Sequence, residues 1–189
     1  MANPLLDDVL PAELAERSQF FEIKGEVGDF ARLVEIVEKD LATIGGSDRP
    51  RKWRQTPVAI RLAFAWADKE RALPRVTGRV SARLTTVCQR CLEAFELPIT
   101  ADIDVLLRSV GSESQRHAAA GDAETWELEK EKLRLVDLVE ESLVMAMPLA
   151  PMHETKGRCG PLARDMEEIE ESMARPFANL RSQMDGNED

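Results

Sequence analysis

The chain has 189 residues, 43% of them apolar and 32% charged, and its formal net charge at pH 7 is −10. This composition is typical of a globular protein with one good-sized core. No run of apolar residues approaches the ~20 that a membrane-spanning helix needs, and residues 1–8 lack the basic and apolar blocks of a signal peptide. The chain has three cysteines, an odd number that does not suggest a secreted disulfide framework. We therefore expect a cytoplasmic protein.

The charge is unevenly distributed along the chain. Residues 49–91 carry eleven lysines or arginines and two acids, whereas the flanking segments are acidic. Either this basic stretch presents an anion-binding face, or its strands pair internally with acidic strands. The sequence leaves both interpretations open.

The N-terminal part predicts an arm, a strand and a helix. Residues 1–17 have no clear period, and we expect a flexible arm with a short helical turn after Pro11. Phenylalanine and isoleucine residues predict a first strand over residues 18–24. Asp29 is a good N-cap, and apolar residues at helical spacing predict a helix over residues 29–44 with one buried stripe.

Apolar and polar residues alternate along residues 52–108, which predicts three consecutive antiparallel strands with one apolar face. The helix at residues 29–44 is the simplest cover for that face. The last two strands form a hairpin around Cys88-Gln-Arg-Cys91, with the two cysteines facing each other. This register matches residue types on both faces, as favoured where one face is buried: Leu84 with Phe95, Arg83 with Glu96 and Arg75 with Asp104.

The following residues predict a loop, a short strand and a second helix. Residues 109–123 are small and polar, which indicates a mobile loop, and residues 126–129 favour a short strand. Asp137 and Glu140 form an Asp-x-x-Glu capping arrangement at the start of a helix that Pro148 ends.

These elements predict an α+β fold, a mostly antiparallel sheet with a central β-hairpin and helices covering one face. We expect residues 18–182 to form a single domain. Residues 1–17 would be its flexible arm, and residues 183–189 an acidic tail.

The cysteines suggest a metal site. Cys88 and Cys91 at a hairpin turn form half of a zinc knuckle, and His153 and Cys159 would supply the other half. The alternative is a set of free thiols with Cys159 packed in the interior. A thioredoxin-like redox role is disfavoured, because the cysteine pair lies between strands and not at a helix start.

Catalytic signals are poor. The chain has no Gly-x-Gly-x-x-Gly sequence and no Walker loop, and nothing marks a nucleophile. Asp102 and Asp104 fit better as partners of arginines than as a nuclease site. We therefore expect a protein that is not an enzyme.

Nucleic-acid or partner binding would rest on basic residues. Trp53 lies in a basic segment, where it either stacks on a base or caps the core at a strand end. Acidic partners are expected for Arg75 and Arg83. The remaining candidates for contact with RNA or a partner are Arg51, Lys52, Trp53, Arg54, Arg79 and Arg90.

Four blocks of sequence occur in a specific order. They are Cys88-Gln-Arg-Cys91-Leu-Glu-Ala-Phe-Glu-Leu-Pro98, Val136-Asp-Leu-Val-Glu-Glu-Ser-Leu-Val-Met-Ala-Met-Pro148, Leu149-Ala-Pro-Met-His153 leading to Cys159, and Arg175-Pro-Phe-Ala-Asn-Leu180. Together with Phe21-Glu-Ile-Lys-Gly25, they resemble the YceD family, the large ribosomal RNA subunit accumulation proteins, over residues 18–182.

The resemblance implies a non-catalytic factor for synthesis, processing or stability of large-subunit (23S) ribosomal RNA, in ribosome biogenesis. The partner would be ribosomal RNA or a large-subunit ribosomal protein. The family supplies no established cofactor and no catalytic residues. The alternative function is a zinc-dependent interaction adaptor for a basic ribosomal protein.

Overall fold

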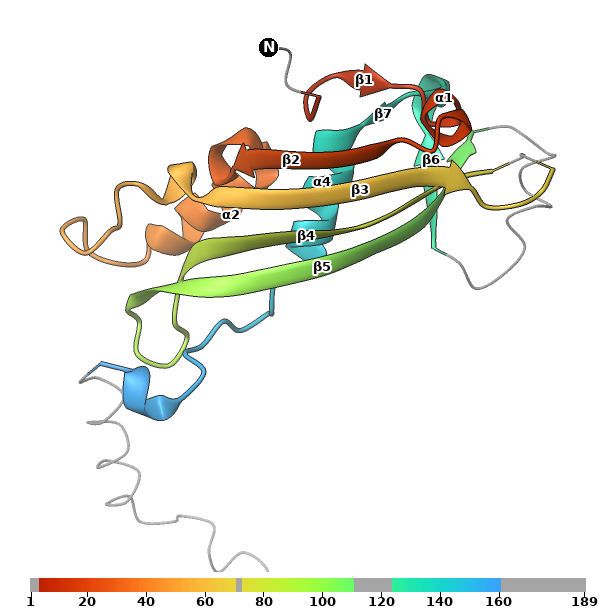
Figure 1. The fold of residues 1–189 in the computed structure, drawn as a ribbon. Helices are drawn as coiled ribbons and strands as arrows, with labels where there is room; N and C mark the ends of the chain where they lie inside the picture. Colours follow the sequence, from red (N-terminus) through yellow and green to blue (C-terminus); the bar gives the residue numbers. More distant parts are fainter. Residues whose placement is uncertain (1–3, 71–72, 111–123, 161–189) are drawn as a thin grey trace, which may run out of the picture.

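The computed structural model describes residues 4–70, 73–110 and 124–160. Its main sheet has five strands in the order β2-β3-β4-β5-β6, antiparallel throughout except for the parallel pair β5–β6. The long strands run side by side across the molecule (Figure 1). The strands are β2 (Phe20–Glu26), β3 (Pro57–Trp66), β4 (Pro74–Val87), β5 (Ala94–Ser109) and β6 (Thr125–Leu128).

Two helices, α2 (Ala31–Leu41) and α4 (Leu135–Met145), pack on one face of this sheet (Figure 1). Side chains alternate between the two faces of a strand, so each long strand sends every second residue into the core. The buried core includes Val58, Ile60, Leu62, Phe64, Val76, Val80, Leu84, Ile99, Ile103, Leu107, Leu33, Leu138 and Leu143. The predicted α+β fold, with its central hairpin and its helices on one face, is confirmed.

Short elements complete the described chain. They are β1 (Asp8–Val9), α1 (Pro11–Glu16), β7 (Leu133–Arg134) and the 3-10 turns η1 (Val27–Asp29), η2 (Trp53–Gln55), η3 (Glu129–Glu131) and η4 (Lys156–Arg158). α1 confirms the helical turn predicted after Pro11. β1 pairs with β7, and Leu5 is fully buried. The flexibility expected of residues 1–17 stays a prediction, as does the division into arm, domain and tail.

The central hairpin has a register two residues away from the predicted one. Thr86, and not Leu84, lies opposite Phe95, and the strands separate at a loop of residues 88–93. A shift by two residues leaves every side chain on its predicted face, whereas a shift by one would not. The alternation in the sequence therefore could not distinguish the two registers.

The predicted N-cap at Asp29 is wrong. Asp29 lies in the 3-10 turn η1, and Phe30 occupies the N-cap position of α2. The Asp29 carboxylate accepts a hydrogen bond from the Glu26 backbone N–H at 2.8 Å. It therefore caps the turn that leads into the helix and not the helix itself.

The predicted capping arrangement at Asp137 and Glu140 is also wrong. Helix α4 begins at Leu135, and the buried Glu140 carboxylate points to the other helix. Its Oε1 accepts hydrogen bonds from the backbone N–H groups of Arg32 at 2.7 Å and Leu33 at 3.2 Å. A side chain of α4 thus satisfies free N–H groups in the first turn of α2 and joins the two helices.

Strand β6 confirms the short strand predicted near residue 126, and its parallel pairing with Leu106–Ser109 was not predicted.

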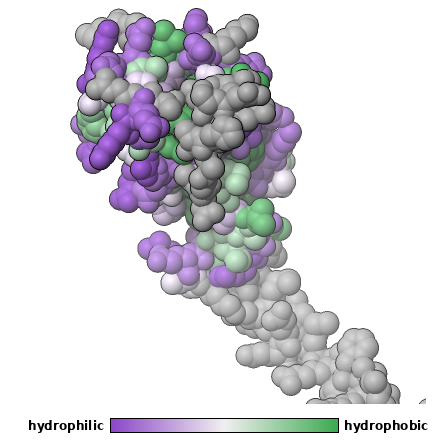
Figure 2. Space-filling view, turned by 90° about the vertical axis from the view of Figure 1, so that its right-hand side faces the viewer, coloured by the Kyte–Doolittle hydropathy of each residue, from purple (hydrophilic) through white to green (hydrophobic). Residues whose placement is uncertain are grey.

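In the described ranges, no helix is long and apolar enough to cross a membrane. Seen from the right-hand side of Figure 1, the surface is largely hydrophilic with apolar patches between (Figure 2). Residues 111–123 of the predicted mobile loop, and the acidic tail, lie outside the described residues.

Candidate functional site

The hairpin loop places two thiols on the same side of the chain. The Cys88 N–H donates to the Glu93 carbonyl at 2.9 Å, and the Leu92 N–H donates to the Cys88 carbonyl at 2.9 Å. Leu92 adopts a left-handed conformation with φ 56°. These bonds close the loop into a tight turn, and Cys88 and Cys91 are both buried inside it.

The segment that follows α4 returns to this loop. The Gln89 N–H donates to the Pro151 carbonyl at 2.9 Å, which anchors residues 149–160 beside the hairpin. Gly160 lies against the Glu93 carboxylate, which would have to shift to make room for a larger side chain at this position. The two contacts bring His153 and Cys159 next to the hairpin thiols.

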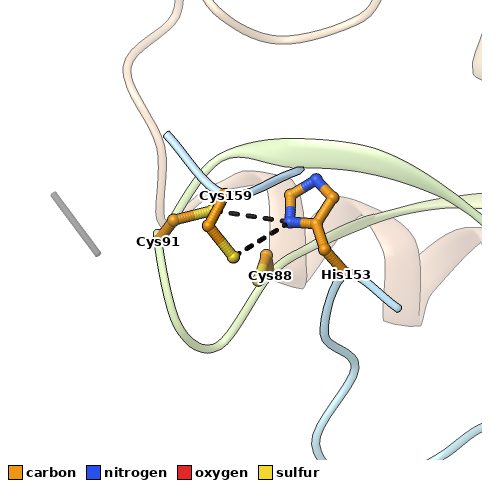
Figure 3. Close-up of side chains that lie close together, drawn as sticks. All are labelled: Cys88, Cys91, His153 and Cys159. Carbon is orange, nitrogen blue, oxygen red and sulfur yellow. Dashed lines mark hydrogen bonds between the residues drawn. The ribbon is translucent and has the colours of Figure 1, made fainter. Parts of the chain in front are cut away.

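All four predicted metal ligands meet in one cluster (Figure 3). Three Sγ atoms and one imidazole nitrogen lie within 4.8 Å of one another. His153 Nδ1 lies 3.6 Å from Cys91 Sγ and 3.7 Å from Cys159 Sγ. The three cysteines are free thiols with no disulfide between them. The Phe95 ring packs on the imidazole, with 4.5 Å between ring centroids.

These separations suit a tetrahedral metal ion. A sulfur at about 2.3 Å and a nitrogen at about 2.0–2.1 Å from a zinc ion are about 3.5–3.6 Å apart at the tetrahedral angle. The two Sγ–Nδ1 distances, 3.6 and 3.7 Å, are within about 0.2 Å of that separation. Three thiols and one imidazole form a Cys₃His donor set, which is typical of structural zinc sites.

The thiols differ in their acidity. Burial raises the pKa of Cys88, but hydrogen bonds from the backbone N–H groups of His153, Arg90 and Cys91 outweigh it and lower the pKa to about 6. Burial and the neighbouring Cys91 raise the pKa of Cys159. The Cys88 thiol is therefore better prepared to ionise than the Cys159 thiol, and the thiolate is the form that binds metal.

A carboxylate at the end of α2 fixes the strand that enters the loop. Asp40 Oδ2 accepts hydrogen bonds from the Thr86 hydroxyl at 2.5 Å and from the Val87 N–H at 2.6 Å. Val87 also packs in a small apolar cluster with α2, which Trp53 covers. Sequence reasoning missed Asp40, since nothing in a helical sequence shows which distant strand its last turn will meet.

The basic segment lies at the same end of the sheet as the hairpin loop. We call this region the hairpin end: residues 49–55, 88–93 and 149–160. Arg51 and Lys52 are exposed, and neither forms an ion pair within the described residues. Trp53 is half-buried against the core, as its alternative interpretation predicted.

The remaining candidate cations have partners within the protein. Arg54 pairs with Glu38 and lies over the Trp53 ring, 5.2 Å from its centroid. Arg90 points inward: Nη1 donates to Cys159 Sγ at 3.7 Å and Nη2 to Met152 Sδ at 3.6 Å.

The expectation that Arg79 is a free charge is wrong. Arg79 lies directly opposite Asp102 on the exposed face of the sheet, and its Nε donates to Oδ1 at 2.6 Å. This hydrogen bond lowers the pKa of Asp102. Internal pairing of basic and acidic strands therefore explains much of the charge on β4. The expected pairs also form: Arg75 with Asp104, and Arg83 with Glu96 at 3.9 Å.

No curated protein and no solved structure matches the chain. The model of the family described as large ribosomal RNA subunit accumulation protein YceD matches residues 76–182, more than half of the chain. The match contains all four members of the cysteine–histidine cluster, and it leaves out residues 51–54. It also leaves out Phe21-Glu-Ile-Lys-Gly25. The chain therefore belongs to the YceD family of large ribosomal RNA subunit accumulation proteins.

Proposed function

We propose that this protein is a non-catalytic factor for the synthesis, processing or stability of large-subunit (23S) ribosomal RNA, and that it acts by binding in the cytoplasm. The family match carries this proposal, because the family is described by the accumulation of that RNA and not by a reaction. A binding role needs a well-held surface with available charges. The hairpin end combines both features.

The second part of the proposal is that Cys88, Cys91, His153 and Cys159 bind one zinc ion. Two Sγ–Nδ1 distances close to those of a tetrahedral zinc site support it, as does the placement of all four donor atoms within 4.8 Å of one another. Such an ion joins the hairpin loop to a segment about 60 residues later in the chain, and ligand sets of this kind contribute their binding energy to folding. Zinc would have a structural role here, since four protein ligands leave no open position for a substrate.

The third part is that RNA phosphates contact the basic side of the hairpin end. Arg51 and Lys52 are the leading contacts because they are exposed and lack internal partners in the described chain. Trp53 and Arg54 follow these two residues in the chain, and Arg54 already forms an ion pair with Glu38. Arg90 donates a hydrogen bond to Cys159 Sγ and so contacts the cysteine–histidine cluster directly. Arg79 would have to break its ion pair with Asp102 to reach a phosphate.

Charge reversal at Arg51 and Lys52 tests this proposal. We expect Arg51→Glu with Lys52→Glu to keep the fold, to weaken binding of 23S rRNA fragments and to lower large-subunit rRNA in cells. Each lost phosphate contact should reduce the salt dependence of binding by about 0.7–0.9 in log–log slope. Arg17→Glu with Lys24→Glu is the matched control, since both residues are exposed and lie outside the hairpin end. A folded Arg51/Lys52 variant with normal rRNA levels and an unchanged slope would remove these two residues as RNA contacts.

The alternative is a zinc-dependent adaptor for a basic ribosomal protein. The net charge of −10 and the carboxylates along β5 favour it. Recovery of partners from lysate with and without ribonuclease separates the two functions. We expect ribonuclease to release the large-subunit components from the tagged protein. A ribosomal protein that stays bound after complete RNA digestion would support the adaptor.

A further inference from the structure

Within the described residues, the outer edge of strand β5 has no pairing strand along much of its length. β6 pairs with β5 only from Leu106 to Ser109, and no other described strand lies on that side of residues 94–105. The Leu106 N–H points outward, because it donates to the Glu124 carbonyl at 2.9 Å. Backbone groups alternate in direction along a strand, so the N–H groups of Thr100, Asp102 and Asp104 also point to the open side.

The position of Pro98 agrees with the outward direction of these N–H groups. It occupies an outward-pointing position of the same alternation, and proline has no N–H to offer there. Proline within a sheet is confined to edge strands, first residues and bulges. In the described chain the open edge therefore runs from Thr100 to Asp104, and Thr100 lies about 24 Å from Glu93 at the end of the hairpin loop, at the usual rise per residue.

A groove lies beside this edge, between β5, β6 and α4, with a volume of about 240 Å³. We call it the β5 groove. Met145 in its wall is 75% exposed, and Trp126 is half-buried. The apolar lining of the groove consists of Ala101, Ile103, Val105, Trp126, Leu138, Met145 and Ala146.

The charges around the β5 groove have one sign. Asp102, Glu124 and Glu141 line it, and no lysine or arginine does. On the exposed face, the arginines that pair with β5 carboxylates come from β4, one strand further in. Asp104, Asp102 and Glu141 already pair with Arg75, Arg79 and Arg32, so a basic segment at this edge would share these carboxylates with arginines of the chain.

We propose that the β5 edge binds an extended, basic peptide segment of a partner protein, which adds to the sheet as a further strand. Its backbone would pair with Thr100, Asp102 and Asp104, as in β-strand addition. Alternate side chains would enter the β5 groove, where apolar ones fit. The others would be lysines or arginines facing the β5 carboxylates.

A second copy of this chain is a poor occupant. Antiparallel pairing of two β5 edges would place carboxylates of one copy beside carboxylates of the other, and like charges directly opposite each other destabilise a sheet. A basic segment reverses the sign of that interaction. The inference does not depend on zinc or on RNA binding at the hairpin end, and it can fail without affecting either.

Hydrogen exchange at single amides tests the proposal on the full chain. In the free protein, the amides of Thr100, Asp102 and Asp104 should exchange fast, while those of Ala101 and Ile103 are protected by pairing with β4. A short synthetic peptide alternating lysine and valine should protect the three outward amides. The same peptide with glutamate in place of lysine should not protect them.

Two substitutions at one position provide the matched control. Thr100→Pro removes an outward N–H in the way that Pro98 already does, and it should weaken peptide binding about tenfold, a loss of about 1.4 kcal/mol. Thr100→Ala keeps the N–H and should bind nearly as the unsubstituted chain does. Outward amides already protected in the free protein, equal protection by the acidic peptide, or protection by RNA alone would each overturn the proposal.

Discussion

Glu140 is a buried carboxylate that belongs to one helix and caps another. Its two hydrogen bonds go to backbone N–H groups in the first turn of α2, where the helix dipole also favours a negative charge. The helix start that Glu140 stabilises lies more than 100 residues earlier in the sequence. Contacts of this kind are invisible to local sequence rules, which assigned Glu140 to the cap of its own helix.

Removing this carboxylate should destabilise the protein. We expect Glu140→Ala to cost ~1–3 kcal/mol in the free energy of unfolding, because it leaves buried N–H groups without an acceptor. Glu141→Ala is the control, since Glu141 forms an exposed pair with Arg32 and should cost well under ~1 kcal/mol. Urea denaturation of both variants measures the difference, and equal effects would show that Glu140 is not the cap.

At the scale of elements, the hairpin β4–β5 supplies the core with Leu84, which is fully buried. We expect Leu84→Ala to cost ~2–5 kcal/mol, as large-to-small changes in a core do. Leu92→Ala, in the loop of the same hairpin, is the matched control because Leu92 is 55% exposed. Should thermal or urea unfolding show under ~1 kcal/mol for Leu84→Ala, the assignment of the buried face would be wrong.

Disulfide formation can test the hairpin register. Ser81 lies opposite Thr100, and facing residues of an antiparallel pair are about 4.5–5.5 Å apart, a span that a disulfide bridges. We expect cysteines at Ser81 and Thr100 to cross-link readily under mild oxidation. Cysteines at Ser81 and Pro98 match the register with Cys88 facing Cys91 and should cross-link poorly. Preferential bond formation in the second pair, measured by mass spectrometry, would restore that register.

Much of the fold followed from the sequence because alternation is a strong local signal. It predicted β3, β4 and β5 and the buried face of each, while helical spacing of apolar residues and capping signals predicted the two helices. The register was wrong by two residues, since the loop of residues 88–93 closes with its own hydrogen bonds and takes up residues that alternation assigns to strands. The parallel strand β6 and the cap at Glu140 depend on long-range contacts, which no local pattern carries.

The members of the cysteine–histidine cluster could be predicted because the chemistry of metal binding restricts the choice. Few residue types bind zinc, and the chain has three cysteines and two histidines. Free charges could not be predicted in the same way. Arg79 pairs with Asp102 and Arg54 pairs with Glu38. The first pair depends on the strand register, and the second depends on how α2 packs.

At the scale of the molecule, the hairpin end joins parts of the chain that are far apart in sequence. Asp40 and Trp53 hold the base of the loop, and residues 149–160 cover its tip. Figure 1 shows this end extending beyond the helices that cover the sheet. With little core beneath it, the tip depends on the bonds within the cysteine–histidine cluster. A zinc ion bound as proposed would therefore hold the proposed binding surface in place.

Removal of zinc should loosen the hairpin end and lower the melting temperature. A ligand bound at a hundred times its Kd adds about 2.7 kcal/mol of stability, which corresponds to about 5–10 °C for a chain of this size. We expect a chelator to produce a shift of this order in calorimetry, and to expose residues 149–160 to protease before the sheet. An unchanged melting temperature would mean that the cluster holds its shape without metal.

The zinc content of the purified protein tests the central claim most directly. Elemental analysis by mass spectrometry should find about one zinc per chain. Cys91→Ser and His153→Ala should lose it, whereas His117→Ala, a change at the other histidine of the chain, should keep it. Protein purified without chelator that contains no zinc and takes up none when zinc is added would contradict the account, and Cys88, Cys91 and Cys159 would then be free thiols packed around His153.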